Sequence, residues 1–439
     1  MVATLANGLR VVTVERHELP LVTASLVALG GAATDPVGKA GASSLSAELM
    51  TKGTTTRSAT EIARAVESLG GSISAGASDD GATIDLTVPS AQADTAMTIL
   101  ADVATHPAFQ QAEIDRARTQ SIDGLNVAMK DPAQLSAMVA DRVVYGGRPY
   151  GQPLSGTPAS LKALTRADLT AAYARSWKPG QATLLFVGDV TPAQAKALAE
   201  RYLGSWRVAG PASASVKPAE PAFPAPRVIV VDMPDAGQAG VVVARSGIRR
   251  ADDRYYPLAV ANTVLGGGFS SRLNQEIRIK RGLAYGAGSS VAAGRDIGMI
   301  SARTQTKNPS AAEVVGLIDQ QMRLLGTAPV PQDELATRQA VLVGGFGRTI
   351  ETTDGIADIL ANYTLQGVPL EELSRYIPRV QAVDSAAVQS ASAALLDPKA
   401  ASIIVVGDAK QFLPALKAAH PDVEVIPADA VNLDSPKLR

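Results

Sequence analysis

The residue types that most often bind catalytic metals are scarce in this sequence. Its 439 residues include three histidines, His17, His106 and His420, and no cysteine. The lack of cysteine excludes disulfide bonds, thiolate nucleophiles and zinc–thiolate sites. No two of the histidines lie four residues apart. The chain therefore cannot place two imidazoles one helical turn apart, as a zinc-binding helix does.

An arginine and a tyrosine, Arg278 and Tyr285, stand seven residues apart in the stretch RIKRGLAY. A serine at 270–271 can cap a helix through the apolar residues that follow, and Gly282 can end it. The next stretch, LAYGAGSSV, then resumes as a strand. Arg278 is expected in the last helical turn and Tyr285 early on the strand, so that the two side chains can converge on one spot.

The elements that position these residues belong to a repeat. The apolar run LVTASLVALG ends at Gly30, and its counterpart AGVVVARSG ends at Gly247. Near the end of each half, ATLLFVGD at 182–189 matches ASIIVVGD at 401–408. These landmarks are related by shifts of 217 to 219 residues. Matching landmarks at both ends of each half indicate a duplicated domain of about 200 residues.

The composition of the middle of the chain marks a linker. Residues 209–226, AGPASASVKPAEPAFPAP, are rich in Pro, Ala and Ser and have no apolar period. The sequence therefore predicts domains at 1–208 and 227–439. Each half begins with two β-rich runs and continues with amphipathic helices, without strict alternation, which favours an α+β fold.

The sequence resembles the pitrilysin-type (M16) zinc peptidases, which include the mitochondrial processing peptidase subunits and the core proteins of respiratory complex III. The resemblance rests on NGLRVV, KGT, RPYGQPLSGT, LQGVPLEEL, the paired VGD strands and, most specifically, FSSRLNQEIRIKRGLAY at 269–285. It implies two homologous domains of the LuxS/MPP-like metallohydrolase type. Each would be a mostly antiparallel sheet with helices packed on one face.

The metal-binding motif of active family members, H-x-x-E-H on a helix, is missing. Counting back from KGT places Ser44, Ala47 and Glu48 at the His, Glu and His positions. Ser and Ala can neither ligate zinc nor act as its base. The third family ligand, a Glu on a later helix, falls on Gly124. We therefore expect no metal or cofactor in this chain, and zinc in a partner subunit.

The resemblance implies an M16B-type non-catalytic subunit that retains the family's Arg/Tyr pair. Arg278 would hydrogen-bond the substrate backbone, and Tyr285 would donate its O–H to the scissile carbonyl. The partner would be a sister subunit with H-x-x-E-H, and the substrate a short or unfolded peptide that adds to a sheet edge. The chain would be inactive alone. The alternatives are a structural core-type subunit and a self-associating peptide-binding protein without a peptidase role.

Charge and glycine patterns exclude other classes of function. The net charge of −1 gives no basic field for nucleic acid, and no run approaches the length of a membrane span. The stretches GGAATDPVGKAG and LGGGFSSRL match neither a P-loop nor G-x-G-x-x-G. The glycines at 266–268 are interpreted as backbone access for a substrate strand. The compartment is left open, with the bacterial periplasm favoured over the cytoplasm by the resemblance alone.

Overall fold

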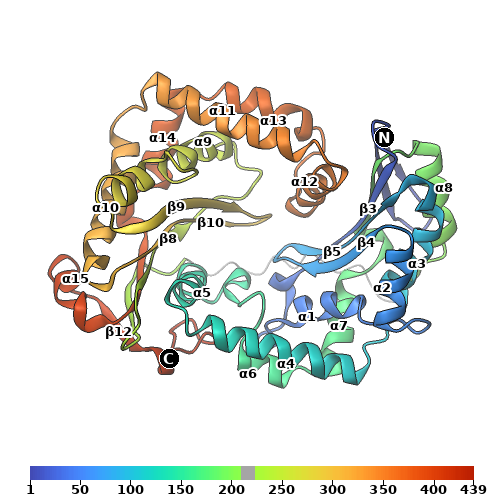
Figure 1. Cartoon of the computed structure of the whole chain (residues 1–439), viewed down its shortest axis with the longest axis horizontal. Helices are drawn as coiled ribbons and strands as arrows, with labels where there is room; N and C mark the ends of the chain where they lie inside the picture. Colours follow the sequence, from blue (N-terminus) through green and yellow to red (C-terminus); the bar gives the residue numbers. More distant parts are fainter. Residues whose placement is uncertain (209–222) are drawn as a thin grey trace. The chain divides into compact units, whose positions relative to one another are not determined.

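The computed structural model describes residues 1–208 and 223–439. Most of the predicted linker at 209–226 lies outside the described residues. The described chain forms two sheets of six strands and divides into two compact units (Figure 1). Within these residues, no helix combines the length and apolar character needed to cross a bilayer.

The first sheet comes from the first half of the chain and has the order β1-β2-β6-β3-β5-β4. Only β2 and β6 run parallel; the other neighbours are antiparallel. Its strands are β1 (Val2–Thr4), β2 (Arg10–Glu15), β3 (Leu21–Leu29), β4 (Ser72–Ala77), β5 (Gly81–Pro89) and β6 (Ala182–Gly188).

The second sheet comes from the second half and has the order β12-β7-β11-β8-β10-β9. Strand β7 runs parallel to β11 and β12, and the remaining neighbours are antiparallel. Its strands are β7 (Val228–Asp232), β8 (Ala239–Ser246), β9 (Ala284–Ala293), β10 (Gly298–Thr306), β11 (Ser402–Gly407) and β12 (Glu424–Pro427).

The strand registers show the internal repeat. Val11 of β2 pairs with Leu184 of β6, and Val228 of β7 pairs with Ile403 of β11. The first members of these pairs are 217 residues apart and the second members 219, as the sequence landmarks are. Five strands of each sheet therefore share one topology, with β4 and β9 as corresponding edge strands. The sixth strand differs, because β1 runs antiparallel to β2 whereas β12 runs parallel to β7. The predicted α+β fold with two mixed, mostly antiparallel sheets is confirmed.

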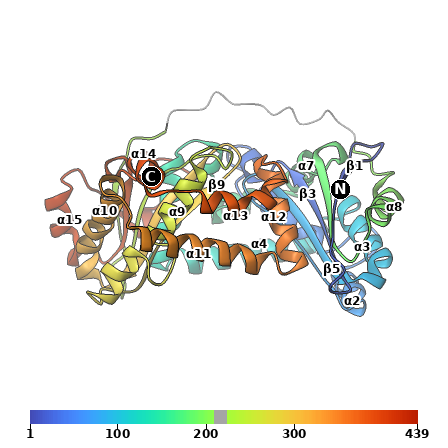
Figure 2. The same ribbon diagram turned by 90° about the horizontal axis from the view of Figure 1, so that it is seen from above.

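Helices from the same half cover one face of each sheet. In the second unit, α10 packs on β8 and β10, α9 packs on β9, and α14 packs against α9 and α10 (Figures 1 and 2). The helices are α1 (Ala42–Met50), α2 (Ala59–Ser68), α3 (Ala93–Thr105), α4 (Gln111–Ala128), α5 (Pro132–Tyr145), α6 (Pro158–Ala163), α7 (Arg166–Ser176), α8 (Pro192–Leu203), α9 (Tyr255–Leu265), α10 (Ala311–Thr327), α11 (Gln332–Thr349), α12 (Thr353–Gln366), α13 (Glu372–Gln381), α14 (Ser385–Leu395) and α15 (Leu413–Ala419).

The opposite face of each sheet receives one helix from the other half of the chain. Helix α12 packs on β3 and β6, and helix α5 packs on β8 and β11. The compact units are therefore discontinuous: the first includes Gly347–Leu373 and the second includes Gly124–Pro153. The sequence predicts two continuous domains, each with helices on one face of its sheet. The exchanged helices also cover the other face of each sheet. This coverage explains why every residue of β6 and β11 is buried, since both faces of these strands are covered.

Candidate functional site in the second unit

Arg278 lies near the end of a short irregular helix. The segment η5 (Asn274–Ile279) is a π-helix, in which the Lys280 amide donates to the Gln275 carbonyl. Such wide turns accommodate an extra residue and occur often at functional sites. Gly282 ends the segment with a positive φ of 61°, as predicted. The element that carries Arg278 is thus a helix end followed at once by strand β9.

The predicted serine cap of this helix is wrong. The Ser270 hydroxyl instead accepts a hydrogen bond of 2.9 Å from Arg338 Nη1, and Arg338 Nη2 donates to the Ser270 carbonyl at 2.5 Å. The Ser271 hydroxyl is buried without a protein partner. A guanidinium from α11 therefore anchors the start of the segment, a long-range contact that the local sequence pattern does not contain.

Tyr285 lies in a β-bulge. The pairing of β9 with β10 slips between Thr304 and Thr306, so that Tyr285 and Gly286 together oppose Gln305. The Thr304 hydroxyl donates to the Gly286 carbonyl at 2.6 Å, and the Thr306 hydroxyl donates to the Leu283 carbonyl at 2.6 Å. These bonds replace ladder partners lost at the slip. A bulge turns side chains out of the regular alternation, and Tyr285 is 89% exposed.

Arg278 and Tyr285 come together as the sequence predicts. The Arg278 Cζ atom lies 5.0 Å from the centroid of the Tyr285 ring and 4.9 Å from that of the Phe269 ring. Both distances are within the range of cation–π contacts. Phe269 is 66% exposed, although large apolar side chains are usually buried. We call these three residues the guanidinium site.

Asn274 ties together the three segments of the guanidinium site. It is buried, and its Nδ2 donates to the Phe269 carbonyl at 2.5 Å. Its Oδ1 accepts from the Ala287 amide of β9 at 3.3 Å. One side chain on η5 thereby fixes the loop that carries Phe269 and the strand that carries Tyr285. The sequence pattern does not mark Asn274 or Phe269 as functional residues. The only signal for Phe269 is that a bulky apolar residue directly follows a glycine run.

The glycine run has an internal role at its first residue. A Cβ at Gly266 would lie 2.2 Å from the Ser289 amide nitrogen, and that amide donates to the Gly266 carbonyl at 3.2 Å. A glycine is therefore required at position 266 so that β9 can approach the backbone there. Gly268 faces open space. Substrate access, predicted for the whole run, remains a hypothesis for Gly268.

The charges around Arg278 leave its guanidinium without a counter-ion. The Glu276 carboxylate accepts hydrogen bonds from Lys280 and from Arg281, the latter at 2.5 Å. The Lys280 bond, followed by that from Arg281, holds the pKa of Glu276 below its usual range. Within the described chain, neither the Arg278 guanidinium nor the Tyr285 hydroxyl has a hydrogen bond or ion pair of its own. The site thus presents an uncompensated positive charge with free donors.

The positions that the resemblance assigns to the metal-binding motif lie on α1 of the first unit. Ser44 donates its hydroxyl proton to the Leu154 carbonyl at 2.7 Å, Ala47 is 1% exposed, and Glu48 is half-buried. Gly124 is exposed within α4, with open space where a Cβ would stand. One carboxylate, one hydroxyl already engaged and a methyl group do not fit a zinc ion, which needs three protein ligands in a catalytic site.

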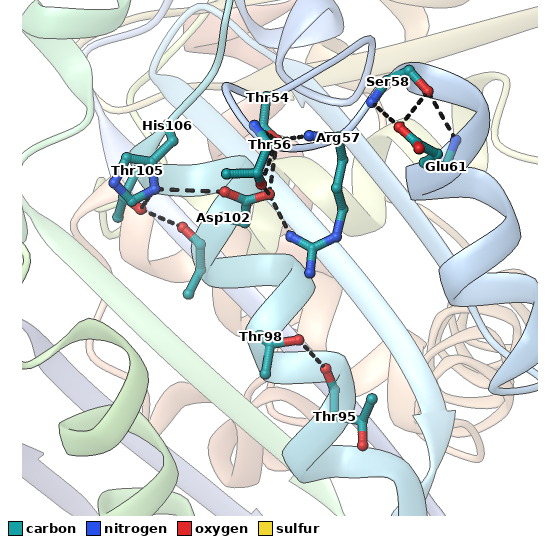
Figure 3. Close-up of polar contacts among 11 residues, drawn as sticks. Thr54, Thr56, Arg57, Ser58, Glu61, Thr95, Thr98, Asp102, Thr105 and His106 are labelled. Atoms are coloured by element: carbon teal, nitrogen blue, oxygen red, sulfur yellow. Dashed lines mark hydrogen bonds and ion pairs between the residues drawn. The ribbon is translucent and has the colours of Figure 1, made fainter.

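The KGT landmark after α1 has a structural role. Figure 3 shows that Asp102 of α3 accepts hydrogen bonds from Thr54, Thr56 and Arg57 at 2.7, 2.9 and 2.5 Å. Burial alone would raise the pKa of Asp102, but these three bonds together hold it below its ordinary value. His106 Nδ1 lies 3.6 Å from the same carboxylate. The cluster fastens the loop after α1 to α3.

The remaining histidines do not build a metal site either. His17 Nδ1 lies 2.7 Å from Asp189 Oδ1 in the turn after β2, and His420 follows α15 in the other unit. Over residues 1–208 and 223–439, no three His, Asp or Glu side chains form a group suited to a metal ion.

Comparison with known proteins agrees with the fold and the motifs. Residues 10–158 match the family described as insulinase (peptidase family M16), and residues 163–342 match the family described as peptidase M16 inactive domain. The chain is 27% identical over 346 residues to an uncharacterized zinc protease of Mycobacterium leprae, covering 78% of this chain and 77% of that protein.

Two solved structures share the fold. The peptidase M16 inactive domain from Pseudomonas fluorescens superposes with a TM-score of 0.87 at 26% identity, covering 93% of this chain and 98% of that chain. A protease from Helicobacter pylori gives a TM-score of 0.84 at 19% identity, covering 93% and 99%. From the two family matches, which adjoin one another along the sequence, the chain belongs to peptidase family M16.

Proposed function

We propose that this chain is the non-catalytic, substrate-gripping subunit of a heteromeric zinc peptidase. The observation that carries the proposal is the contrast between the two units. Helix α1 carries Ser44, Ala47 and Glu48 where the resemblance places the metal-binding motif, whereas Arg278 and Tyr285 lie together with unused donors. A purely structural subunit has no need for such a pair.

In the proposed reaction, the chain's own residues hold and polarise the substrate amide. Arg278 donates to a backbone carbonyl of the bound peptide, and Tyr285 donates its O–H to the scissile carbonyl as negative charge develops on the oxygen. The sister subunit would hold the zinc ion, which would supply the nucleophile for hydrolysis. The names of several relatives, which call them zinc proteases, support this chemistry for the assembled enzyme.

The substrate class proposed is a short or unfolded peptide that binds as an added strand. In the middle of β9 the Ala287 and Ser289 amides are already bound by Asn274 and Gly266. The centre of β9 is therefore not available for added backbone pairing, and the peptide adds to another sheet edge.

The proposal is tested by reconstitution. The purified chain is mixed with an M16 subunit that carries H-x-x-E-H, and cleavage of a quenched fluorescent peptide is followed. We expect activity only in the mixture, its loss with a chelator, and a rate about 10²–10³-fold lower with Tyr285→Phe, since one oxyanion donor is removed. A complex that forms but never cleaves would instead indicate a structural core-type subunit, and no complex at all a separate peptide-binding protein.

A further inference from the structure

Arg278 is held by aromatic faces rather than by hydrogen bonds. Its Cζ lies over both the Phe269 ring and the Tyr285 ring, at 4.9 and 5.0 Å from their centroids. A cation–π contact uses the face of the guanidinium, whereas its five N–H donors point outward in the plane of the group. The two rings therefore restrict the guanidinium and leave its donors available to a ligand.

The local charges favour an anionic ligand at this position. Glu276, the acidic residue of the same helix, is occupied by Lys280 and Arg281. Arg278 has no ion pair in the described chain, so no described residue compensates its charge. A planar guanidinium with free donors matches a carboxylate, to which it can donate two parallel hydrogen bonds.

Peptide hydrolysis creates such a group at this place. Water adds its oxygen to the carbonyl carbon and the C–N bond breaks. One product then ends in a carboxylate, and the nitrogen of the other takes both protons of the water and becomes an ammonium group. The uncleaved amide presents one neutral carbonyl oxygen, but the product presents two oxygens that share a negative charge. The new carboxylate forms at the carbonyl that Tyr285 is proposed to hold, and the Arg278 Cζ lies 5.0 Å from the centroid of the Tyr285 ring. The guanidinium should therefore bind the carboxylate product more strongly than the uncleaved amide.

We propose that the guanidinium site binds the C-terminal carboxylate of peptides, so that this chain, even without its partner, retains the carboxylate product of cleavage. The proposal rests on the proposed function for the position of the scissile bond, but the binding itself needs neither the partner nor zinc. Phe269 is a positioning residue, since its ring restrains the guanidinium without contacting the carboxylate. Peptides with a free C-terminus then act as product inhibitors of the assembled enzyme.

The test uses the full-length chain without a partner. Fluorescence anisotropy measures the binding of fluorescein-labelled Ala-Val-Ala-Val-Ala with a free C-terminal carboxylate and of the same peptide with a C-terminal amide. We expect the acid to bind at least about threefold more tightly than the amide. The ratio is modest because the ion pair between Arg278 and the peptide carboxylate would be accessible to solvent. Arg278→Met should abolish the preference. Arg278→Lys should reduce it, because the charge remains but the paired donors are lost.

A neighbouring arginine provides the matched control. Arg281 is three residues away, exposed and paired with Glu276, so Arg281→Met should leave the preference intact. Phe269→Leu keeps apolar bulk but removes the aromatic face. It should reduce the ratio by which the acid peptide binds more tightly than the amide peptide. Equal affinity for acid and amide, no binding of either, or an equal loss with Arg281→Met would overturn the inference.

The inference and the proposed function can fail separately. If the reconstituted mixture never cleaves but the isolated chain prefers the acid, only the peptidase role is lost. If cleavage depends on Tyr285 and the chain shows no preference for the acid, only the carboxylate site is lost.

Discussion

At the scale of single residues, the placement of Tyr285 depends on its neighbours more than on its own side chain. The slip between β9 and β10 turns the phenol outward, and Thr304 and Thr306 bind the carbonyl groups displaced by that slip. Arg278 likewise occupies a wide helical turn. Two backbone irregularities thus bring one cation and one phenol together, which regular elements with the same residue spacing would not ensure.

Asn274 offers a direct test of this positioning. Asn274→Ala removes the donor to the Phe269 carbonyl and the acceptor of the Ala287 amide, both in a buried setting. We expect a loss of about 1–3 kcal/mol in the free energy of unfolding of the second unit, because partners are left unsatisfied. Hydrogen exchange read by NMR should show faster exchange at Ala287.

Asn274→Asp separates the two bonds. A carboxylate still accepts from the Ala287 amide but cannot donate to the Phe269 carbonyl. Protection at Ala287 should therefore persist while the Phe269 loop loosens. Unchanged exchange at Ala287 in the alanine variant would show that Asn274 does not hold the strand.

At the scale of elements, the exchanged helices decide how the sheets are covered. Residues Val12, Leu185 and Val187 of the first sheet pack with Ile356 and Leu360 of α12 in one core cluster. Side chains alternate along a strand, so the neighbouring residues of β6 face the helices of their own half. A helix that lies far along the sequence is therefore part of the core of the first unit.

Leu360→Ala tests the contribution of this helix. Leu360 is 2% exposed, and its truncation should cost about 2–5 kcal/mol. Because α12 packs on β3 and β6, hydrogen exchange measured by mass spectrometry should accelerate in those strands, although they come from the opposite half of the chain.

Leu325→Ala is the matched control. Leu325 also lies in the second half and is fully buried, but it belongs to the core cluster of the second sheet. It should accelerate exchange in β8 and leave β3 and β6 unchanged. If Leu360→Ala destabilised only the second sheet, the assignment of α12 to the first unit would be incorrect.

At the scale of the whole molecule, the features that could be predicted from the sequence are those encoded by local residue patterns. The repeat, the α+β class and the convergence of Arg278 on Tyr285 could be predicted from landmark shifts, strand runs and the stop at Gly282. The exchange of α5 and α12 could not, because a helix's apolar face does not specify which sheet it covers. The roles of Phe269 and Asn274 depend on contacts across loops, for which the sequence has no period.

Whether the metal-motif positions can bind zinc is a matter of residue type rather than of fold. Ligands are residue types, and the types at Ser44, Ala47 and Gly124 cannot bind zinc wherever the backbone places them. The retained pair, by contrast, has meaning only through its geometry. Both facts support the proposal that the reaction is divided between two polypeptides.

The zinc-to-protein ratio of the isolated chain tests this division most directly. The purified chain is incubated with excess zinc, passed through a desalting column and analysed by inductively coupled plasma mass spectrometry. We expect a ratio below about 0.1, since no three-ligand site is available. A ratio near one, held against a desalting column, would contradict the claim that this chain leaves the metal to its partner.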